Sequence, residues 1–280
     1  MKFDLHCHSS ASDGTLAPAE LVRRAHKNGV DVLALTDHDV TDGLAEAAAA
    51  AADLPLRFVS GVEISVTWCG KTIHIVGLGI DSENLALAAG LASVRDSRVS
   101  RGRLIAAELA KLGIEGSFEA ALAYTRNPQT LSRTHFARHL VEKGYARDVR
   151  SVFHQYLGEG KPGYVPHQGA TLDKAVAWID ASGGVAVIAH PGRYGHSRNQ
   201  AGVLIREFRD CGGKGIEVLT ASHTADQARL YAELSRKYGL AASCGSDFHS
   251  PGESRVDLGA LAPLPSDLKP IWELLEIDPH

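Results

Sequence analysis

The sequence predicts an α/β barrel that carries a small, all-helical insertion. Two features of the 280 residues lead to this prediction: short apolar runs alternate with amphipathic or alanine-rich segments, and the apolar runs finish on polar residues. Alternation of strands and helices is typical of a largely parallel sheet, either open or closed into a barrel. Apolar strands with polar ends favour the barrel, whose functional sites lie at the carboxyl ends of its strands.

Seven apolar runs predict the strands of this barrel, and five segments between them predict helices. The predicted strands cover residues 2–8, 31–38, 57–68, 72–80, 184–191, 215–220 and 241–249. The predicted helices lie near residues 18–28, 43–53, 171–182, 200–210 and 224–239. The length fits one α/β barrel with an insertion, or about two domains.

The stretch from about 83 to 168 lacks any strand pattern. It predicts a long helix over 83–112 and shorter helices near 117–125, 132–143 and 147–157. Residues 98–168 hold 11 Lys and Arg against 6 Asp and Glu, a net of +5, whereas the remainder holds 18 against 27, a net of −9. We therefore predict a barrel built from residues 1–97 and 169–280, with a helical insertion at 98–168. A basic surface suits an anionic ligand, although a solvated helix face would give the same asymmetry.

Composition excludes several classes of function. A net charge of −4 gives no overall attraction to nucleic acid or to an acidic membrane surface. No apolar run is long enough to span a bilayer, and the N-terminus lacks the pattern of a signal peptide. Four scattered cysteines indicate neither a disulfide framework nor a thiolate zinc site. We expect a cytoplasmic protein with no membrane association and no obligate protein partner.

The polar ends of the strands carry residues that bind metals. In "DLHCHSSASDG" strand alternation places His6 and His8 on one face and Cys7 on the apolar face with Phe3 and Leu5. Similar side chains follow in or after the other strands, so that a closed barrel would gather nine of them at one mouth. These nine are His6, His8, Asp13, His38, Glu63, His74, His190, Asp247 and His249.

Nine buried polar groups need partners, and metal ions satisfy all of them. Nitrogen and carboxylate ligands without thiolate suit Mn, Fe or Zn, and nine ligands are too many for one ion, so two or three ions are expected. Ions about 3.5–4 Å apart can share a hydroxide and clamp both oxygens of a phosphoryl transfer. The residues therefore predict hydrolysis, with phosphate esters as the leading substrate class.

The motifs "DLHCHSSASDG", "ALTDHD", "GVEIS", "HIVGLGID", "AHPGR" and "GSDFH" occur in this order. The chain resembles the PHP (polymerase and histidinol phosphatase) metal-dependent phosphoesterases over essentially its whole length. This resemblance implies a distorted β/α barrel of seven strands with a site for two or three metals, and all nine positions above match its ligand pattern. We expect the metal to be Mn, with Fe or Zn as alternatives. The insertion resembles that of a nucleotide-acting branch, which removes the 3′-phosphate of nucleoside 3′,5′-bisphosphates; some members trim short RNA from its 5′ end. Ser132 and Thr134 depart from the Gly and Pro expected around Arg133.

Roles can be assigned within this scheme. We expect a metal-bridging hydroxide to attack phosphorus, with Glu63 as a bridging carboxylate or, alternatively, a terminal ligand. Asp247, if strongly perturbed, or His196 would protonate the leaving group, unless the metals stabilise it alone. The expected phosphate-binding residues are Arg101, Arg133, His135, Lys161 and Arg193.

Three alternatives stay open. A 5′-to-3′ exonuclease acting on short RNA would use the same site. A histidinol-phosphate phosphatase would give no reason for a basic insertion. A non-catalytic module, like those attached to polymerases, is expected to have lost ligands, whereas here all nine positions are filled.

Overall fold

The computed structural model describes residues 1–277 and contains one seven-stranded sheet in the order β1 to β7. Strands β1, β2 and β3 are parallel, as are β5, β6 and β7, whereas β4 is antiparallel to both its neighbours. The strands are β1 (Phe3–Asp4), β2 (Val32–Leu35), β3 (Arg57–Trp68), β4 (Lys71–Leu78), β5 (Val185–Ile188), β6 (Gly215–Thr220) and β7 (Ala241–Gly245). The largely parallel sheet is thus confirmed, with one strand reversed.

The reversal of β4 follows from the turn before it. Only Cys69 and Gly70 join β3 to β4, and both have positive φ angles, 48° and 75°. Two-residue turns of this handedness match the twist of a β-hairpin, and no helix is available to carry the chain back for a parallel strand.

Hydrogen bonds between the first and last strands bring the sheet close to a closed barrel. The Leu5 N–H donates to the Cys244 carbonyl at 3.0 Å, and the His8 N–H donates to the Phe248 carbonyl at 2.8 Å. A Cβ atom on Gly245 would lie 2.2 Å from the His6 Cβ, so only glycine permits this approach. The distorted seven-stranded barrel is confirmed.

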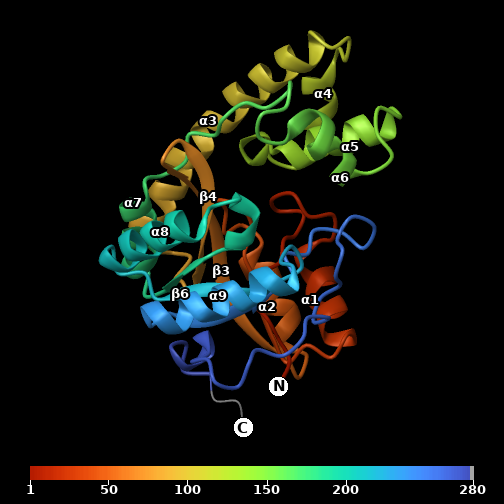
Figure 1. The fold of residues 1–280 in the computed structure, drawn as a ribbon. Helices are drawn as coiled ribbons and strands as arrows, with labels where there is room; N and C mark the ends of the chain where they lie inside the picture. Colours follow the sequence, from red (N-terminus) through yellow and green to blue (C-terminus); the bar gives the residue numbers. More distant parts are fainter. Residues whose placement is uncertain (278–280) are drawn as a thin grey trace.

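Five helices surround the barrel where they were predicted (Figure 1). They are α1 (Pro18–Lys27), α2 (Leu44–Ala52), α7 (Leu172–Ala181), α8 (Arg198–Asp210) and α9 (Ala225–Tyr238). Side chains of β2 point alternately into two hydrophobic clusters. Leu33 and Leu35 pack in the larger cluster, which includes residues from all five helices. Val32 and Ala34 pack in a smaller cluster between the strands.

One face assignment was wrong. Cys7 is buried in the larger cluster, and its thiol donates to the Ala34 carbonyl, whereas Phe3 and Leu5 belong to the smaller cluster. Strand β1 is only two residues long, so strict alternation does not extend to Cys7. The interpretation of Cys7 as a core residue agrees with its complete burial.

Helix α3 (Leu85–Ala110) connects the barrel to the helical segment above it (Figure 1). Its first half places Leu87 and Leu91 in the larger barrel cluster, and its second half places Ile105 and Leu109 in a third, separate cluster. That third cluster is completed by α4 (Ser117–Leu122), α5 (Arg133–Glu142), α6 (Val149–Val152) and the π-helical turn η2 (Phe153–Leu157). Residues 98–168 contain no strand. The two boundaries of this unit stay a prediction, because helix α3 runs without a break across the N-terminal boundary at residue 98.

The C-terminal segment was not predicted to have structure. Its short helix η4 (Ile271–Glu273) stacks the Trp272 ring on Phe3, with ring centroids 3.8 Å apart, and buries Ile271 in the smaller cluster. Phe3 starts β1, so this segment covers the end of the barrel opposite the polar strand ends. Among the helices of residues 1–277, none combines the length and the apolar character needed to cross a bilayer.

Candidate metal centre and active site

The nine predicted metal ligands converge at one end of the barrel. Seven come from the parallel strand ends and the loops that follow them, Glu63 lies within β3, and His74 lies on the antiparallel β4. The nine residues fall into four groups whose ligand atoms lie within 4.8 Å of one another. The groups are His8, Asp13, His38 and His249; His6, His190 and Asp247; His6, His8 and Glu63; and His38, Glu63 and His74. Side chains that are up to 243 positions apart in the sequence (6 and 249) thus form one cluster, because the closed sheet brings their strand ends together.

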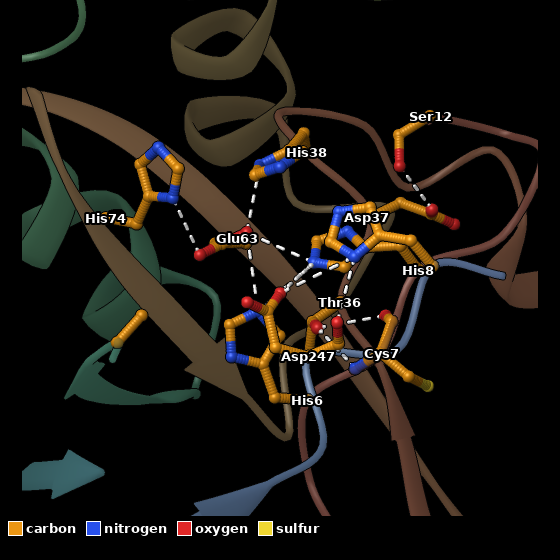
Figure 2. A network of polar contacts seen from close by, with 12 residues as sticks. His6, Cys7, His8, Ser12, Thr36, Asp37, His38, Glu63, His74 and Asp247 are labelled. Atoms are coloured by element: carbon orange, nitrogen blue, oxygen red, sulfur yellow. Dashed lines mark hydrogen bonds and ion pairs between the residues drawn. The ribbon is translucent and has the colours of Figure 1, made fainter. Parts of the chain in front are cut away.

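Glu63 lies at the centre of this cluster (Figure 2). Its Oε1 atom is 2.8 Å from both His74 Nδ1 and His190 Nε2. Its Oε2 atom is 2.9 Å from His38 Nδ1 and 3.3 Å from His8 Nε2. The two oxygens of one fully buried carboxylate therefore face different histidines, which is the arrangement that a shared ligand requires.

Outer partners fix two of the histidines. Glu217 accepts from His6 Nδ1 at 2.7 Å through one oxygen and from the His190 backbone N–H through the other. This bond leaves His6 Nε2 facing the cluster, 3.4 Å from Glu63 and 3.6 Å from Asp247. The strand pattern alone left the role of Glu217 open; the contacts place it behind two predicted ligands, where carboxylates commonly orient metal-binding histidines.

The backbone is strained at this edge of the barrel. His190 and Asp247 have positive φ angles of 26° and 53°, and Asp39, which follows His38, has a φ of 54°. Non-glycine residues rarely adopt this conformation, and such strain concentrates at functional sites.

The protonation of the cluster suits divalent cations. Burial acts to raise the pKa of Glu63, but His74, His38 and His6 outweigh it and hold that pKa well below its ordinary value. Burial, reinforced by Arg193, lowers the pKa of His190 to about 4, so its ring is neutral at pH 7. Ionised carboxylates and neutral imidazoles are the forms that bind metals.

Two further observations test this fit. The buried atoms Asp13 Oδ1 and Glu63 Oε2 lie close to histidine nitrogens but accept no hydrogen bond of good geometry, which is costly without another partner. Burial opposes a charge on His8, but Asp247 and Glu63 outweigh it and raise the pKa of His8 to about 10, so these groups attract a positive charge between them. A bound cation would supply that charge, and the residues present therefore fit a cluster of divalent metals.

A sequence model of the PHP domain matches residues 4–221, more than three quarters of the chain. The chain belongs to the PHP domain family. It is 53% identical to a 3′,5′-nucleoside bisphosphate phosphatase of Chromobacterium violaceum, over 98% of this chain and 96% of that protein. It is 41% identical to a 5′-3′ exoribonuclease of Haemophilus influenzae, over 97% and 98% of the two chains. The chain is also similar to a solved structure described as an amidohydrolase from Chromobacterium violaceum with bound sulfate and no metal. The two sequences are 52% identical, and the structures superpose with a TM-score of 0.95 over 99% of this chain and 96% of that one.

Three predicted phosphate-binding residues of this PHP chain are arginines near the cluster. Arg193 donates to Asp247 Oδ2 at 2.8 Å, and half of its side chain is exposed. Arg101 donates to the Val165 carbonyl at 2.9 Å, and Arg133 donates to the Leu157 carbonyl at 3.1 Å. Burial, together with the nearby Arg133 and Arg98, lowers the pKa of Arg101 to about 9.

The other predicted substrate-binding and catalytic residues differ in their surroundings. His135 is buried, its Nδ1 accepts from the Ser132 N–H at 3.0 Å, and burial lowers its pKa to about 4. Lys161 is half-buried in the return loop of the insertion. Tyr164 lies under the Arg133 guanidinium, 5.5 Å from ring centroid to Cζ, so at least one of its faces is already covered.

Neither predicted proton donor has the expected environment. His196 lies against Trp68 and Tyr194, and among the described residues it contacts none of the nine ligands. Burial acts to raise the pKa of Asp247, but His8 and Arg193 outweigh it and hold that pKa well below its ordinary value. An ionised Asp247 suits a metal ligand, and its pKa is not raised as a proton donor at neutral pH would require, so the condition set for this role is not met.

Sequence reasoning missed several polar residues that support the site. Arg98 of α3 is buried, and it forms an ion pair with Asp39, which also accepts from the Ser65 N–H at 2.7 Å. Asp37 accepts from Ser9 and Ser12, holding the loop that carries Asp13 (Figure 2). "ALTDHD" signalled acidic residues around His38 but gave no indication of their partners.

Two further missed residues lie on the insertion and its return loop. Arg138 of α5 donates to both carboxylate oxygens of Glu253, each at 2.8 Å, and to the Asp13 carbonyl at 2.7 Å. His167 is buried with both ring nitrogens unpartnered, and burial and Arg98 lower its pKa to about 3. Both residues have polar groups on the side of the insertion that faces the barrel.

A cleft of about 830 Å³ opens from the cluster and runs between the barrel and helices α5 and α6. The predicted ligands Asp247 and His249 line its inner end together with Arg193, and Arg147 and Arg150 line its outer part. This volume is within the range of small-molecule sites in proteins.

Proposed function

We propose that this protein is a metal-dependent phosphatase that hydrolyses the 3′-phosphate of nucleoside 3′,5′-bisphosphates, such as adenosine 3′,5′-bisphosphate, to give the 5′-nucleotide and phosphate. The nine convergent ligands and the family support the hydrolytic chemistry. The 53% identical relative that is named for this activity supports the substrate. The proposal includes two or three divalent ions, with Mn²⁺ as the first choice and Fe or Zn as alternatives, since nitrogen and oxygen ligands suit all three.

In this proposal all nine residues would hold the metals, and Glu63, whose two oxygens face different histidines, would be shared between them. When bound, the ions lower the pKa of a water molecule that attacks phosphorus and neutralise negative charge on the phosphoryl oxygens. The protein orients its ligands through Glu217 behind His6 and His190, and through Arg193 beside Asp247. Arg193 is half-exposed at the inner end of the cleft, where its remaining donors can meet a phosphate oxygen.

One observation carries the choice of a bisphosphate: Arg101 and Arg133 are half-buried cations that donate only to backbone carbonyls within residues 1–277. Burial lowers the pKa of both, and the charge of Arg133 adds to the lowering at Arg101, so the two guanidinium groups are close enough for one to act on the other. A buried cation without a counter-charge is costly unless a ligand supplies the charge. A second phosphate group on the substrate would do so, because the guanidinium fork matches phosphate oxygens.

The test compares substrates with and without that second phosphate. The chelator-stripped protein, reloaded with Mn²⁺, is given adenosine 3′,5′-bisphosphate or adenosine 3′-monophosphate, and phosphate release is measured. We expect kcat/KM to be higher for the bisphosphate, and Arg133→Met to lower it about 10–100-fold for the bisphosphate alone, as for a lost charge-assisted hydrogen bond. The matched control is Arg103→Met, which also removes one arginine of the insertion. Arg103 lies on α3 and covers the ring of Phe118, with Cζ 4.4 Å from the ring centroid, so its loss should not affect either substrate.

Equal kcat/KM values for the two adenosine phosphates, or an equal loss for both in Arg133→Met, would exclude the proposed role of the arginines. Activity on histidinol phosphate alone would exclude the nucleotide and leave the metal chemistry intact.

We also propose a location in the reducing cytoplasm, since all four cysteines are free.

A second candidate function, 5′-to-3′ trimming of short RNA, is favoured by the cleft. It continues beyond the ligands to Arg147 and Arg150, so a chain of nucleotides has room and cations along its path. A 41% identical relative is named as a 5′-3′ exoribonuclease. A 5′-phosphorylated oligonucleotide in the same assay decides between the two: a higher kcat/KM for it than for the bisphosphate would make trimming the main activity.

A further inference from the structure

The residue that caps the N-terminus of the insertion's helix α5 contacts the candidate metal cluster. Ser132 caps the N-terminus of α5, and its Oγ accepts from the Thr134 N–H at 3.1 Å. The same hydroxyl donates to Asp13 Oδ2 at 2.9 Å, across 119 positions of sequence. Ser132 is only 9% exposed, so this bond is largely shielded from water. One hydroxyl thus joins the helical insertion to a predicted metal ligand.

The two oxygens of Asp13 have different surroundings. Oδ2 accepts the Ser132 bond, whereas Oδ1 faces His249 Nε2 at 3.3 Å and His38 Nε2 at 3.9 Å. Oδ1 is buried and accepts no hydrogen bond, so it is the oxygen that is left for a cation. A carboxylate rotates freely unless one oxygen is held, and the Ser132 bond therefore determines which oxygen faces the histidines.

The main chain of Asp13 is held from the same helix. Arg138, one and a half turns further along α5, donates to the Asp13 carbonyl at 2.7 Å and is itself held by Glu253. Among the described contacts of Asp13, the hydrogen bond to Oδ2 comes from the Ser132 hydroxyl and not from a donor of the barrel. Helix α5 thus fixes both the backbone and the side-chain orientation of this residue.

We propose that Ser132 is a positioning residue: its hydroxyl orients Asp13 toward a divalent cation in the group formed by His8, Asp13, His38 and His249, and so couples that metal position to the insertion. The inference rests on the proposed function, because it takes the four residues as metal ligands. It adds that the affinity of one metal position depends on a residue outside the barrel that does not touch the metal.

The test separates the hydroxyl from the helix cap. Ser132→Gly removes the hydroxyl and keeps most of the capping energy, because glycine costs only a few tenths of a kcal/mol at an N-cap. Ser132→Thr keeps a hydroxyl in the same place. Ser197→Gly is the matched control, since Ser197 caps α8 with the same kind of capping box and contacts none of the nine ligands in the described structure. Mn²⁺ binding to each chelator-stripped protein is measured by titration calorimetry, and its thermal unfolding is recorded.

We expect the wild-type protein to bind at least two Mn²⁺ per chain. In Ser132→Gly one of these equivalents should bind about 10–100-fold more weakly, as for the loss of a partner behind a metal ligand, with the other equivalents unchanged. Ser132→Thr and Ser197→Gly should bind Mn²⁺ like the wild-type protein, and the stripped proteins should unfold at similar temperatures.

The inference is overturned if Ser132→Gly binds every Mn²⁺ as tightly as the wild-type protein, or if Ser197→Gly weakens binding equally. It is also overturned if all equivalents weaken together while the stripped Ser132→Gly protein melts earlier, because the residue would then act only as a cap. A wild-type protein that binds fewer than two Mn²⁺ would instead overturn the proposed function, which distinguishes the two failures.

Discussion

The buried His135 provides a quantitative test of how the insertion packs on the barrel. Its ring is 1% exposed, and burial lowers its pKa from 6.5 to about 4. The unfolded chain therefore takes up a proton near pH 6.5, whereas the folded protein takes one up only near pH 4. The folded state thus loses stability as the pH falls from 6.5 towards 4, and none above that range.

The size of the effect follows from the two pKa values. One pKa unit corresponds to about 1.4 kcal/mol, so a shift of about 2.5 units removes about 3 kcal/mol below pH 4 and about 2 kcal/mol at pH 5. Glutamine is the matched replacement, because it does not titrate and its side-chain oxygen can accept the Ser132 N–H as His135 Nδ1 does. We expect His135→Gln to lose about 2 kcal/mol less than the wild-type protein between pH 7.5 and pH 5.

The assay is urea-induced unfolding of both proteins at the two pH values, with a chelator present so that metal binding does not contribute. The free energy of unfolding at pH 7.5 is the reference for each protein, and a further measurement at pH 8.5 should show no difference in slope. Equal losses between pH 7.5 and pH 5 would refute the reasoning, since they would mean that His135 is protonated as readily in the folded as in the unfolded chain.

Three further predictions concern the barrel edge. Arg98→Met leaves the buried Asp39 carboxylate without its cation and should lower the free energy of unfolding by about 3–5 kcal/mol. The double variant with Asp39→Asn should recover part of this loss in urea unfolding, and no recovery would argue against the ion pair. Glu217→Gln turns a donor toward His6 or the His190 N–H and should weaken Mn²⁺ binding about 10–100-fold in calorimetry, an outcome that unchanged binding would contradict. Gly245→Ala would place a Cβ atom 2.2 Å from the His6 Cβ and should lower the free energy of unfolding by about 3 kcal/mol or more. The control is Gly252→Ala, where a Cβ atom would have no neighbour within 4 Å and should cost little. Equal effects of the two variants in thermal or urea unfolding would refute the close approach of β1 and β7.

The sequence was most informative where local pattern and burial agree. Histidines and carboxylates at the ends of apolar runs, such as "VIAHP" and "CGSDFH", could be recognised because a buried strand has no local reason to end on these residues. The strands 57–68 and 215–220 match β3 and β6 residue for residue, since both are bounded by turn residues and carry continuous apolar faces.

Pairing between distant residues could not be predicted from the sequence. Asp39 and Arg98 lie 59 positions apart, and Asp13 and Ser132 lie 119 apart, so each residue type is visible but its partner is decided by tertiary packing. The environment of Asp247 depends on such packing too, because Arg193 comes from another loop and holds its pKa down. The C-terminal segment showed no periodicity, since it packs as an irregular chain with a single short helix.

The closure of the sheet has a consequence for how the chain acquires its shape. The first strand pairs with the last, as in the bond between Leu5 and Cys244, so the ring of strands cannot be completed until residues as far as 244 have left the ribosome. Contacts of such long sequence separation slow folding and leave an unpaired strand edge exposed in the meantime. The candidate metal cluster includes both His6 and His249, so its ligands come together only when the ring of strands closes, and metal uptake would then mark the finished fold.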